Sequence, residues 1–306
     1  MAGIILNRLA VMFVYLIPGF ILYKKKIITD AGAKDIGKLL IYMILPAAII
    51  NSYNIEYSKE KVIGLLISFT VAFVAVIISV VLSRLLFKKD KPIEIFGASF
   101  SNAGFMGIPL VAAVVGADAV YYCAAFVAIL NILQWSYGVF LMTGNKTNIS
   151  PKKIIFNPIL LSFVIGICLF FFPVKLPEFF GGILSTVASM NAPVAMLGVG
   201  IYLAQVSFKE LFYEKISYKV SLIRLLVIPL ITAIVIALLP MGDYTLKQTL
   251  VIVASAPIGS NVAVYAQIYG CDYKQAVKEV VLSTLLCIAS MPLIIGISDY
   301  ILQNIR

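Results

Sequence analysis

The stretch SNAGFMGIPLVAAVVGAD, from Ser101 to Asp118, decides how this chain is interpreted. It is apolar enough to lie in a membrane, yet it carries Gly104, Gly107 and Pro109 where a spanning helix should be most regular. Proline has no backbone N–H to donate and its ring crowds the preceding turn, while glycine lowers the cost of leaving helical geometry. We therefore expect a membrane helix that unwinds near GFMGIP.

The composition of the whole chain indicates a membrane protein. Of its 306 residues, 62% are hydrophobic and 12% are charged, with a mean hydropathy of +1.05, whereas a soluble domain has roughly 25% charged residues. The chain has no histidine, and none of its four cysteines forms a CxxC pair. Imidazole catalysis, zinc sites and a disulfide framework therefore lack their residues. We predict an all-α polytopic membrane protein with no cofactor and no metal site.

Ten segments are long and apolar enough to cross about 30 Å of hydrocarbon, which takes ~20 residues each. The first is interpreted as a span and not as a removed signal peptide, because no small-residue cleavage site precedes the next charged cluster. The ten predicted spans are 4–23, 36–54, 62–87, 93–115, 119–142, 153–172, 179–204, 216–239, 246–268 and 277–301.

The lysines and arginines orient these spans. Seventeen of the 24 lie in the loops after spans one, three, five, seven and nine, six lie on the other side, and Arg224 lies within span eight. Because Lys and Arg collect in cytoplasmic loops, a multi-pass protein of the cell membrane with both termini on the non-cytoplasmic side is predicted. The cluster Lys24, Lys25 and Lys26 could bind lipid headgroups or nucleic acid, but an orientation signal explains it fully. We expect membrane lipid and no nucleic acid as a partner.

An odd number of spans on each side of a central cytoplasmic loop predicts two halves of opposite orientation, a 5+5 inverted repeat. The halves are residues 1–143 and 153–306, joined by a short cytoplasmic linker at 144–152. LPAAIINSY in span two resembles APVAMLGVGIY in span seven, and GIPLVAAVVGAD in span four can be aligned with NVAVYAQIYGCD in span nine. Apolar segments also match by composition alone. Inverted repeats with interrupted helices in corresponding positions nevertheless point to a secondary transporter.

Span nine is interrupted like span four, since ASAPIGSNVAVYA places prolines, glycines and polar residues in mid-membrane. Two broken helices that cross would present half-helix N-termini, which suit an anion, and half-helix C-termini, which suit a cation. The alternative is a pair of proline kinks that only shape packing. The residues expected to bind substrate are Asn102, Gly107, Pro109, Pro257, Ser260 and Asn261. A second tier comprises Ser101, Gly104, Asn131 and Gln134, the last two on one face of span five.

The charged residues near the membrane carry further expectations. All fourteen acidic residues lie at span ends or in loops, so we expect no carboxylate at the membrane midplane. A coupling ion, proton or sodium, would then be held by neutral oxygens, or by Glu94, Asp118 or Glu279 approached from a vestibule. We expect Arg224, early in span eight, to snorkel to the interface and not to act as a counter-charge for substrate.

SNAGFMGIPLVAAVVG and SAPIGSNVAVYAQIYG resemble the fourth-helix and ninth-helix motifs of the auxin efflux carrier family, and the similarity extends to LPAAIINSY and VAMLGVGIYLAQ. The resemblance implies a fold related to PIN-type auxin exporters and bile-acid/sodium symporters. Spans one, two, six and seven would form a dimerising scaffold, and spans three to five with eight to ten an elevator-like transport domain. The family exports plant auxin or moves small dicarboxylates such as malate and malonate in microbes.

Three departures from the plant members point to the microbial branch. The central linker is short, Val262 stands where plant members have a second proline, and SFTVAFVAVIISVVLS lacks their acidic residue. Auxin itself and a carboxylate-based coupling site are thereby disfavoured. The hypothesis is a non-enzymatic secondary transporter of a small organic anion, mono- or dicarboxylate. The alternatives are a sodium-coupled symporter of amphipathic or sterol-like anions and, from another class, a membrane receptor or an intramembrane enzyme, which would lack a nucleophile with its base.

Overall fold

The computed structural model describes residues 2–172, 176–240 and 242–304, and helices account for nearly all of its regular structure. Within that part of the chain, six helices are long and apolar enough to cross a membrane. The predicted all-α membrane class is confirmed by these helices. They are Gly3–Lys24, Lys59–Leu86, Ala117–Thr143, Glu178–Gln205, Lys215–Leu238 and Tyr273–Asn304.

The predicted spans two, four, six and nine are not among these six helices, and each consists of shorter pieces. The count of ten spans and the inverted repeat therefore stay predictions. The pieces are α2 (Asp30–Leu39), η1 (Leu40–Ile44) and α3 (Leu45–Ser52); α5 (Pro92–Ser99), η2 (Ala103–Gly107) and α6 (Ile108–Val114); α9 (Pro151–Ile155) and α10 (Pro158–Phe171); and α16 (Tyr244–Ala254) and α17 (Asn261–Ile268).

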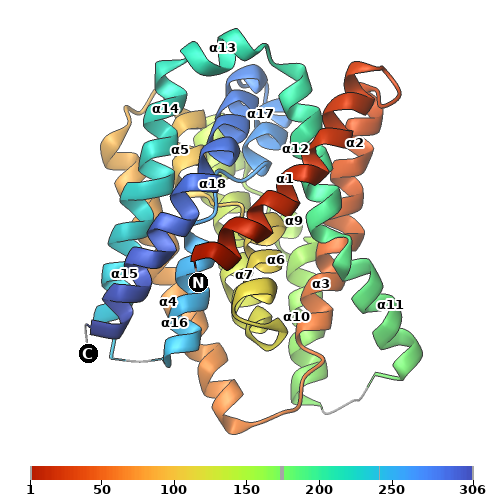
Figure 1. The fold of residues 1–306 in the computed structure, drawn as a ribbon, viewed down its shortest axis with the longest axis vertical. Helices are drawn as coiled ribbons and strands as arrows, with labels where there is room; N and C mark the ends of the chain where they lie inside the picture. Colours follow the sequence, from red (N-terminus) through yellow and green to blue (C-terminus); the bar gives the residue numbers. More distant parts are fainter. Residues whose placement is uncertain (1, 173–175, 241, 305–306) are drawn as a thin grey trace.

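The two ends of the molecule differ in charge. At the upper end in Figure 1 lie α13 (Phe208–Tyr213), the start of α2 and the connection into α5. These segments carry eight of the 20 lysines: Lys24, Lys25, Lys26, Lys34, Lys88, Lys89, Lys91 and Lys209. The connections from α3 to α4 (Lys59–Leu86) and into α16 lie at the lower end. We call the upper end the lysine-rich end. Lys175, Arg306 and the terminal residue Met1 lie outside the described residues.

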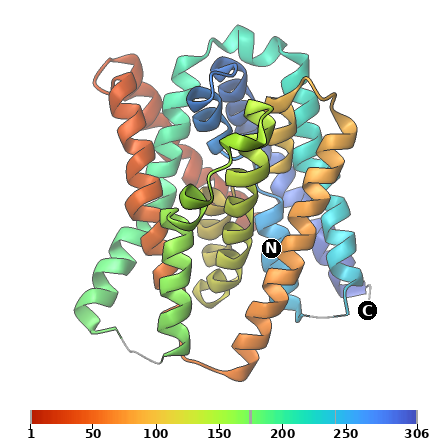
Figure 2. The same cartoon turned by 180° about the vertical axis from the view of Figure 1, so that it is seen from behind.

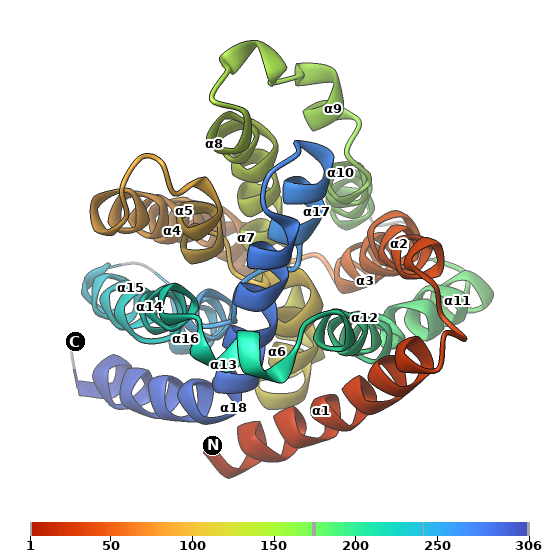
Figure 3. The same cartoon turned by 90° about the horizontal axis from the view of Figure 1, so that it is seen from above.

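The helices form two groups, with the interrupted segments between them. Seen from above in Figure 3, one group contains α1, α3 and α10 to α12, and the other contains α4, α5, α14 to α16 and α18, while α6, α7 and α17 lie between. The segment from α8 through η5 and α9 to α10 runs over the outer surface (Figure 2). The other helices named here are α1 (Ala2–Lys24), α7 (Val120–Leu133), η4 (Gln134–Gly138), α8 (Val139–Thr143), η5 (Lys146–Asn148), α11 (Glu178–Ser189), α12 (Asn191–Gln205), α14 (Lys215–Leu222), η6 (Ile223–Val227), α15 (Ile228–Leu238) and α18 (Tyr273–Asn304).

The first group is tied together by backbone contact between α1 and α12. A Cβ atom on Gly200 would lie 2.0 Å from the carbonyl oxygen of Leu16, and one on Gly19 would lie 2.1 Å from that of Leu197. Small residues allow membrane helices to approach this closely. The two helices therefore pack with their backbones in direct contact.

Three prolines follow a π-helical turn, which explains how they lie inside helices. Pro46, Pro109 and Pro229 come two residues after the ends of η1, η2 and η6. In each case the residue before the proline donates its N–H to the carbonyl five residues back. The wider turn makes room for the proline ring, which would otherwise crowd the preceding turn.

The predicted position of the break in span four is therefore wrong. Residues 103–114 are helical, through GFMGIP and past Pro109. The chain leaves helical geometry earlier, at Phe100 to Asn102, because the π-turn accommodates the proline.

Candidate functional site

The interruptions of the two broken segments lie against each other. The chain is non-helical between Ser99 and Ala103 and between Ala254 and Asn261. The N–H of Asn102 donates to the carbonyl oxygen of Pro257 at 2.7 Å, and the N–H of Gly259 donates to that of Phe100 at 3.0 Å. Together these bonds form an isolated antiparallel bridge at Ser101 and Ile258. Each break thus satisfies backbone groups of the other, which lipid could not do.

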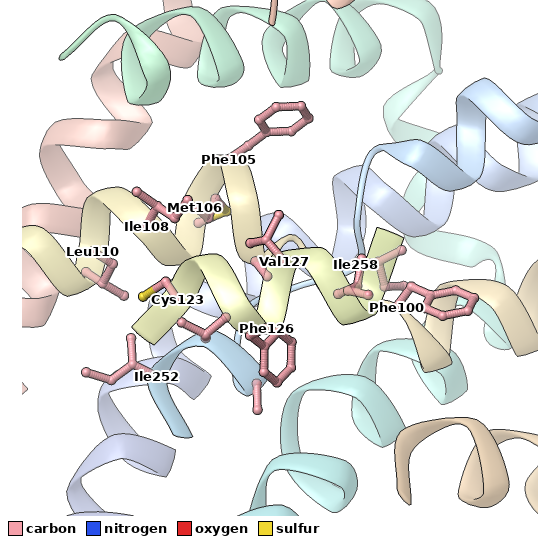
Figure 4. Packing of buried hydrophobic residues seen from close by; sticks show 14 of the residues in the cluster. Phe100, Phe105, Met106, Ile108, Leu110, Cys123, Phe126, Val127, Ile252 and Ile258 are labelled. Carbon is pink, nitrogen blue, oxygen red and sulfur yellow. The ribbon is translucent and has the colours of Figure 1, made fainter. Parts of the chain in front are cut away.

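Tight packing holds this crossing. Phe100 and Ile258 are both fully buried and lie next to each other in Figure 4. A Cβ atom on Gly259 would lie 3.2 Å from the carbonyl oxygen of Ser101, so a glycine permits the close approach of the two chains.

Arg224 neutralises one side of the crossing. Its guanidinium donates to the carbonyl oxygens of Ala98 at 3.1 Å and Ser99 at 3.4 Å, and it also bonds the carbonyl oxygen of Ala254. These carbonyls end α5 and α16, so one side chain caps the C-termini of both first half-helices. Helix C-termini carry partial negative charge, which a cation stabilises.

The expectation that Arg224 snorkels to the interface is therefore wrong, because the residue is only 1% exposed. Its position early in span eight suggested an interfacial residue. The tertiary fold instead surrounds it with the ends of two other helices. No feature of the local sequence marks that arrangement.

The N-termini of the two second half-helices border a small cavity. Asn102, Ser260 and Asn261 line it, together with Phe105 and Tyr202. Its volume is about 40 Å³, room for a few water molecules but not for a dicarboxylate. Other lining residues come from α2 and η1, toward the lysine-rich end. The partial positive charge of two helix N-termini thus meets at one small cavity, which we call the crossing cavity.

The polar side chains at this cavity are incompletely hydrogen bonded. The buried Nδ2 of Asn102 has no partner among the described residues, and neither does the Oγ of Ser101. Asn261 donates to Gln134 Oε1 at 2.8 Å, which leaves the buried Nε2 of Gln134 without a partner. Unpaired buried amide donors are costly and occur where a ligand or water supplies the missing acceptor.

The other residues predicted to bind substrate either take part only through the backbone or lie away from the crossing cavity. Pro257 takes part through its backbone carbonyl, while Gly107 and Gly104 lie against the side chains of Val253 and Leu45 respectively. The structure does not bring these two glycines to the crossing cavity. It also turns Asn131 away, since its Nδ2 donates to the carbonyl of Val127, four residues earlier on its own helix, at 2.8 Å.

A larger cavity of about 400 Å³ lies between α3, α6, α11 and α12, toward the opposite end of the molecule. Pro109 lines this cavity and not the crossing cavity. Its polar lining consists of amides and hydroxyls with one carboxylate, Asp118, and no described Lys or Arg lines it. The polar lining residues are Asn51, Ser52, Asn54, Asp118, Ser185, Ser189 and Asn191.

Asn191 links this cavity to the broken segment. Its Nδ2 donates to the carbonyl oxygen of Gly104 at 2.9 Å. In the i to i+5 pattern of the π-turn that carbonyl would accept from residue 109, which is a proline without an N–H. Asn191 therefore replaces the missing donor from across the interface between the two groups. No local feature of the sequence pairs Asn191 with Gly104, which lies 87 residues away.

We predict that Asn191→Ala lowers the free energy of unfolding by about 1–3 kcal/mol, because a buried carbonyl loses its donor. Pro109→Ala restores an N–H that can reach the same carbonyl. The Asn191→Ala, Pro109→Ala double variant should therefore melt above Asn191→Ala alone. Thermal unfolding of the four proteins in detergent measures this coupling, and strictly additive effects would contradict it.

Two carboxylates are more buried than their positions at span ends indicated. Glu279 is fully buried on α18, where its Oε1 accepts from Gln275 Nε2 at 3.0 Å. Glu94 is buried on α5, with Lys91 Nζ 3.7 Å away. Glu279 lies close to the crossing, since a Cβ on Gly97, three residues before Phe100, would lie 2.7 Å from its Oε2. The absence of a carboxylate from the membrane midplane stays a prediction. Helix α18 begins at Tyr273, and α5 and α14 cover its first turns.

Comparison with known proteins identifies the family. The family described as membrane transport protein matches residues 4–295. A protein of Rhizobium meliloti (strain 1021) named "Putative malonate transporter" is 24% identical over 270 residues, 84% of each chain. An uncharacterized transporter of Methanocaldococcus jannaschii is 24% identical over 293 residues, 91% of this chain and 92% of the relative. An uncharacterized transporter of Methanothermobacter thermautotrophicus is 26% identical over 201 residues, 64% of each chain.

The family match covers both broken segments and the helices around them. The predicted resemblance is thus confirmed, and so is the prediction that the protein is not an enzyme. The chain belongs to the membrane transport protein family, the family of the auxin efflux carriers, and is a membrane transporter.

Proposed function

We propose that this protein is a secondary transporter of a small organic anion, a mono- or dicarboxylate, which binds at the crossing cavity. The observation that carries the proposal is the unpaired, buried Nδ2 of Asn102 beside the N-terminus of α17. A carboxylate accepts from amide donors and is stabilised by helix N-termini. Arg224 already occupies the opposite, negative ends of the crossing, so the free ends favour an anion.

The polar groups of the crossing cavity and the printed name of one relative support the proposed substrate class. The crossing cavity offers neutral donors from Asn102, Ser260 and Asn261, with the second amide of Gln134 next to them. Such donors discriminate by geometry without the cost of a buried ion. One relative is named for malonate. We therefore propose a short dicarboxylate such as malonate or malate as the first substrate to test.

The proposed mechanism is alternating access by an elevator movement of one helix group against the other, in a fold of ten spans related as an inverted repeat. Two features support it: a closely packed α1 and α12 pair in one group, and two cavities toward opposite ends, both bordered by α12. In this state the crossing cavity is too small for substrate, so the moving group must shift to admit it. We also propose a homodimer formed through the scaffold and both termini on the non-cytoplasmic side of the cell membrane, as the family resemblance and the lysine distribution imply.

Counterflow tests the proposal directly. Proteoliposomes loaded with unlabelled malonate or malate should accumulate labelled substrate well above protein-free vesicles. A set of sterol-like anions run in parallel separates this function from transport of amphipathic anions. Accumulation of the sterol-like anions without malonate or malate counterflow would overturn the proposed substrate class.

We predict that this transport does not depend on sodium. The carbonyl oxygens that end α5 and α16 would be suitable ligands for a sodium ion, but the guanidinium of Arg224 already binds three of them. Replacing sodium by choline on both sides of the vesicle should change the rate of counterflow by less than about twofold, a difference of under about 0.4 kcal/mol. Loss of flux without sodium would favour the sodium-coupled alternative.

A further inference from the structure

The carboxyl group of Glu279 and the guanidinium of Arg224 are an acid and a cation near one turn of α5, and among the described residues neither forms an ion pair. Glu279 is 0% and Arg224 1% exposed. Glu279 Oε2 approaches Gly97, and Arg224 donates to the next two residues along that helix. Both the Oε2 of Glu279 and the Nε of Arg224 lack a hydrogen-bond partner within the described residues.

The other charges around Glu279 are already paired. Lys91 lies 3.7 Å from Glu94 on α5, and Lys278 lies 2.9 Å from Glu214 at the start of α14. No ion pair among the described residues joins Glu279 to Arg224 or to any other cation. An ionised carboxylate with an unpaired, water-excluded oxygen is strongly disfavoured. The site therefore suits the neutral acid in this state.

Besides Glu94 on α5 and Arg224 on η6, the helices packed against α18 carry fourteen titratable side chains. Helix α15 carries none. The titratable side chains on the remaining neighbours are Arg8, Tyr15, Tyr23 and Lys24 on α1; Tyr202 on α12; Lys209, Glu210 and Tyr213 on α13; Lys215, Tyr218 and Lys219 on α14; Tyr244 and Lys247 on α16; and Tyr265 on α17.

We propose that Glu279 is the proton site of this transporter, which binds one proton in one orientation of the moving helix group and releases it in the other. The inference rests on the proposed function. While Glu279 is neutral, Arg224 stays on the carbonyls of Ala98, Ser99 and Ala254 and holds the crossing together. When the proton leaves, the carboxylate competes with these carbonyls for the guanidinium. The protonation state of one side chain thereby changes how firmly both half-helices are held.

This arrangement gives coupling without a metal ion. Protonation is the binding of H⁺ to a carboxylate oxygen, so one positive charge is taken up on one side and the same charge is returned on the other. Buried carboxylates of membrane transporters serve as proton relays in this way. Arg224 supplies the permanent cation, and Glu279 supplies the group that changes its charge.

The test uses the full chain in proteoliposomes with an internal pH-sensitive dye. External malonate should acidify the wild-type vesicles, and an inward proton gradient should stimulate malonate uptake. Glu279→Gln mimics the neutral acid, so it should retain malonate counterflow while proton movement and gradient stimulation fall about tenfold, within the usual range of coupling between sites. Because malonate itself binds protons, variants are compared at the same pH. Glu94→Gln is the matched control, since Glu94 is also buried but has Lys91 beside it; it should behave as wild type.

The outcomes separate the two proposals. Wild-type vesicles without malonate or malate counterflow would overturn the proposed function and this inference with it. Counterflow in Glu279→Gln with undiminished proton movement would overturn the inference alone. Should Glu279→Gln not accumulate in the membrane, Glu279→Asp replaces it: the shorter carboxyl should shift the pH midpoint of proton movement, and an unchanged midpoint contradicts the assignment.

Discussion

Replacing Arg224 by methionine is expected to lower the free energy of unfolding by about 3 kcal/mol or more and the melting temperature by roughly 6–12 °C. Methionine keeps an unbranched apolar side chain in place of the arginine stem but has no hydrogen-bond donor. Three carbonyl oxygens at the ends of α5 and α16 would then lose their partner inside the protein. Lipid and the buried surroundings supply no replacement, so each oxygen bears its full desolvation cost.

A matched control separates this effect from loss of a positive charge in general. Lys219 also donates to a backbone carbonyl, that of Leu86 at 3.1 Å, but its bond is exposed to solvent. Lys219→Met should therefore cost less than about 1 kcal/mol. Arg224→Lys retains the charge with fewer and differently placed donors, so an intermediate melting temperature is expected. If Arg224→Met melts with the wild type, the guanidinium does not hold the crossing.

Replacing Asn102 by alanine is expected to reduce malonate counterflow at subsaturating substrate by about 10- to 100-fold, since a hydrogen bond to a charged group contributes about 1.5–3 kcal/mol. The melting temperature should change little, because Asn102 Nδ2 has no hydrogen-bond partner among the residues that the structure describes. Its backbone N–H bond to Pro257 does not depend on the side chain. A loss of flux with unchanged stability would therefore report on substrate binding.

Asn131→Ala is the control for this experiment. Asn131 is also a buried asparagine close to the broken segments, but its Nδ2 already donates to Val127 on its own helix. It should lose at most a modest amount of stability and keep its transport. Asn261→Ala should reduce flux as well, and it leaves Gln134 without its hydrogen bond. Unchanged counterflow in both Asn102→Ala and Asn261→Ala would remove these residues from the mechanism.

The sequence allowed only part of the candidate site to be predicted. Asn102, Ser260 and Asn261 could be predicted because a polar residue beside glycine and proline in an apolar span has few uses other than a site or a kink. The position of the break could not be predicted. Pro109 looks like the breaking residue, but the π-turn of η2 accommodates it, and the carbonyl it leaves free is bonded by Asn191, far away in the sequence.

Charged residues were the least predictable part. Arg224 and Glu279 lie near the ends of apolar segments, where long side chains ordinarily reach water. Both are buried because other helices end on them or cover them: α5 and α16 end at Arg224, while α5 and α14 pack over the first turns of α18. Whether a residue at a helix end is buried depends on which other helices pack against it. The position of the residue in the sequence does not show this.

The sequence by itself determined the membrane class, the helical fold, the family and the two interrupted segments, because hydropathy and the backbone chemistry of proline and glycine are local properties. Only the tertiary structure decided that the interruptions hydrogen bond to each other and that Arg224 caps two helices at once. It also decided that Glu279 lies close to α5 with no hydrogen-bond partner for its Oε2 among the described residues. Most of these contacts join residues more than 100 positions apart, such as Ala98 with Arg224 and Asn102 with Pro257. Their free energy comes from satisfying polar groups away from water, and which groups meet depends on how all the helices pack.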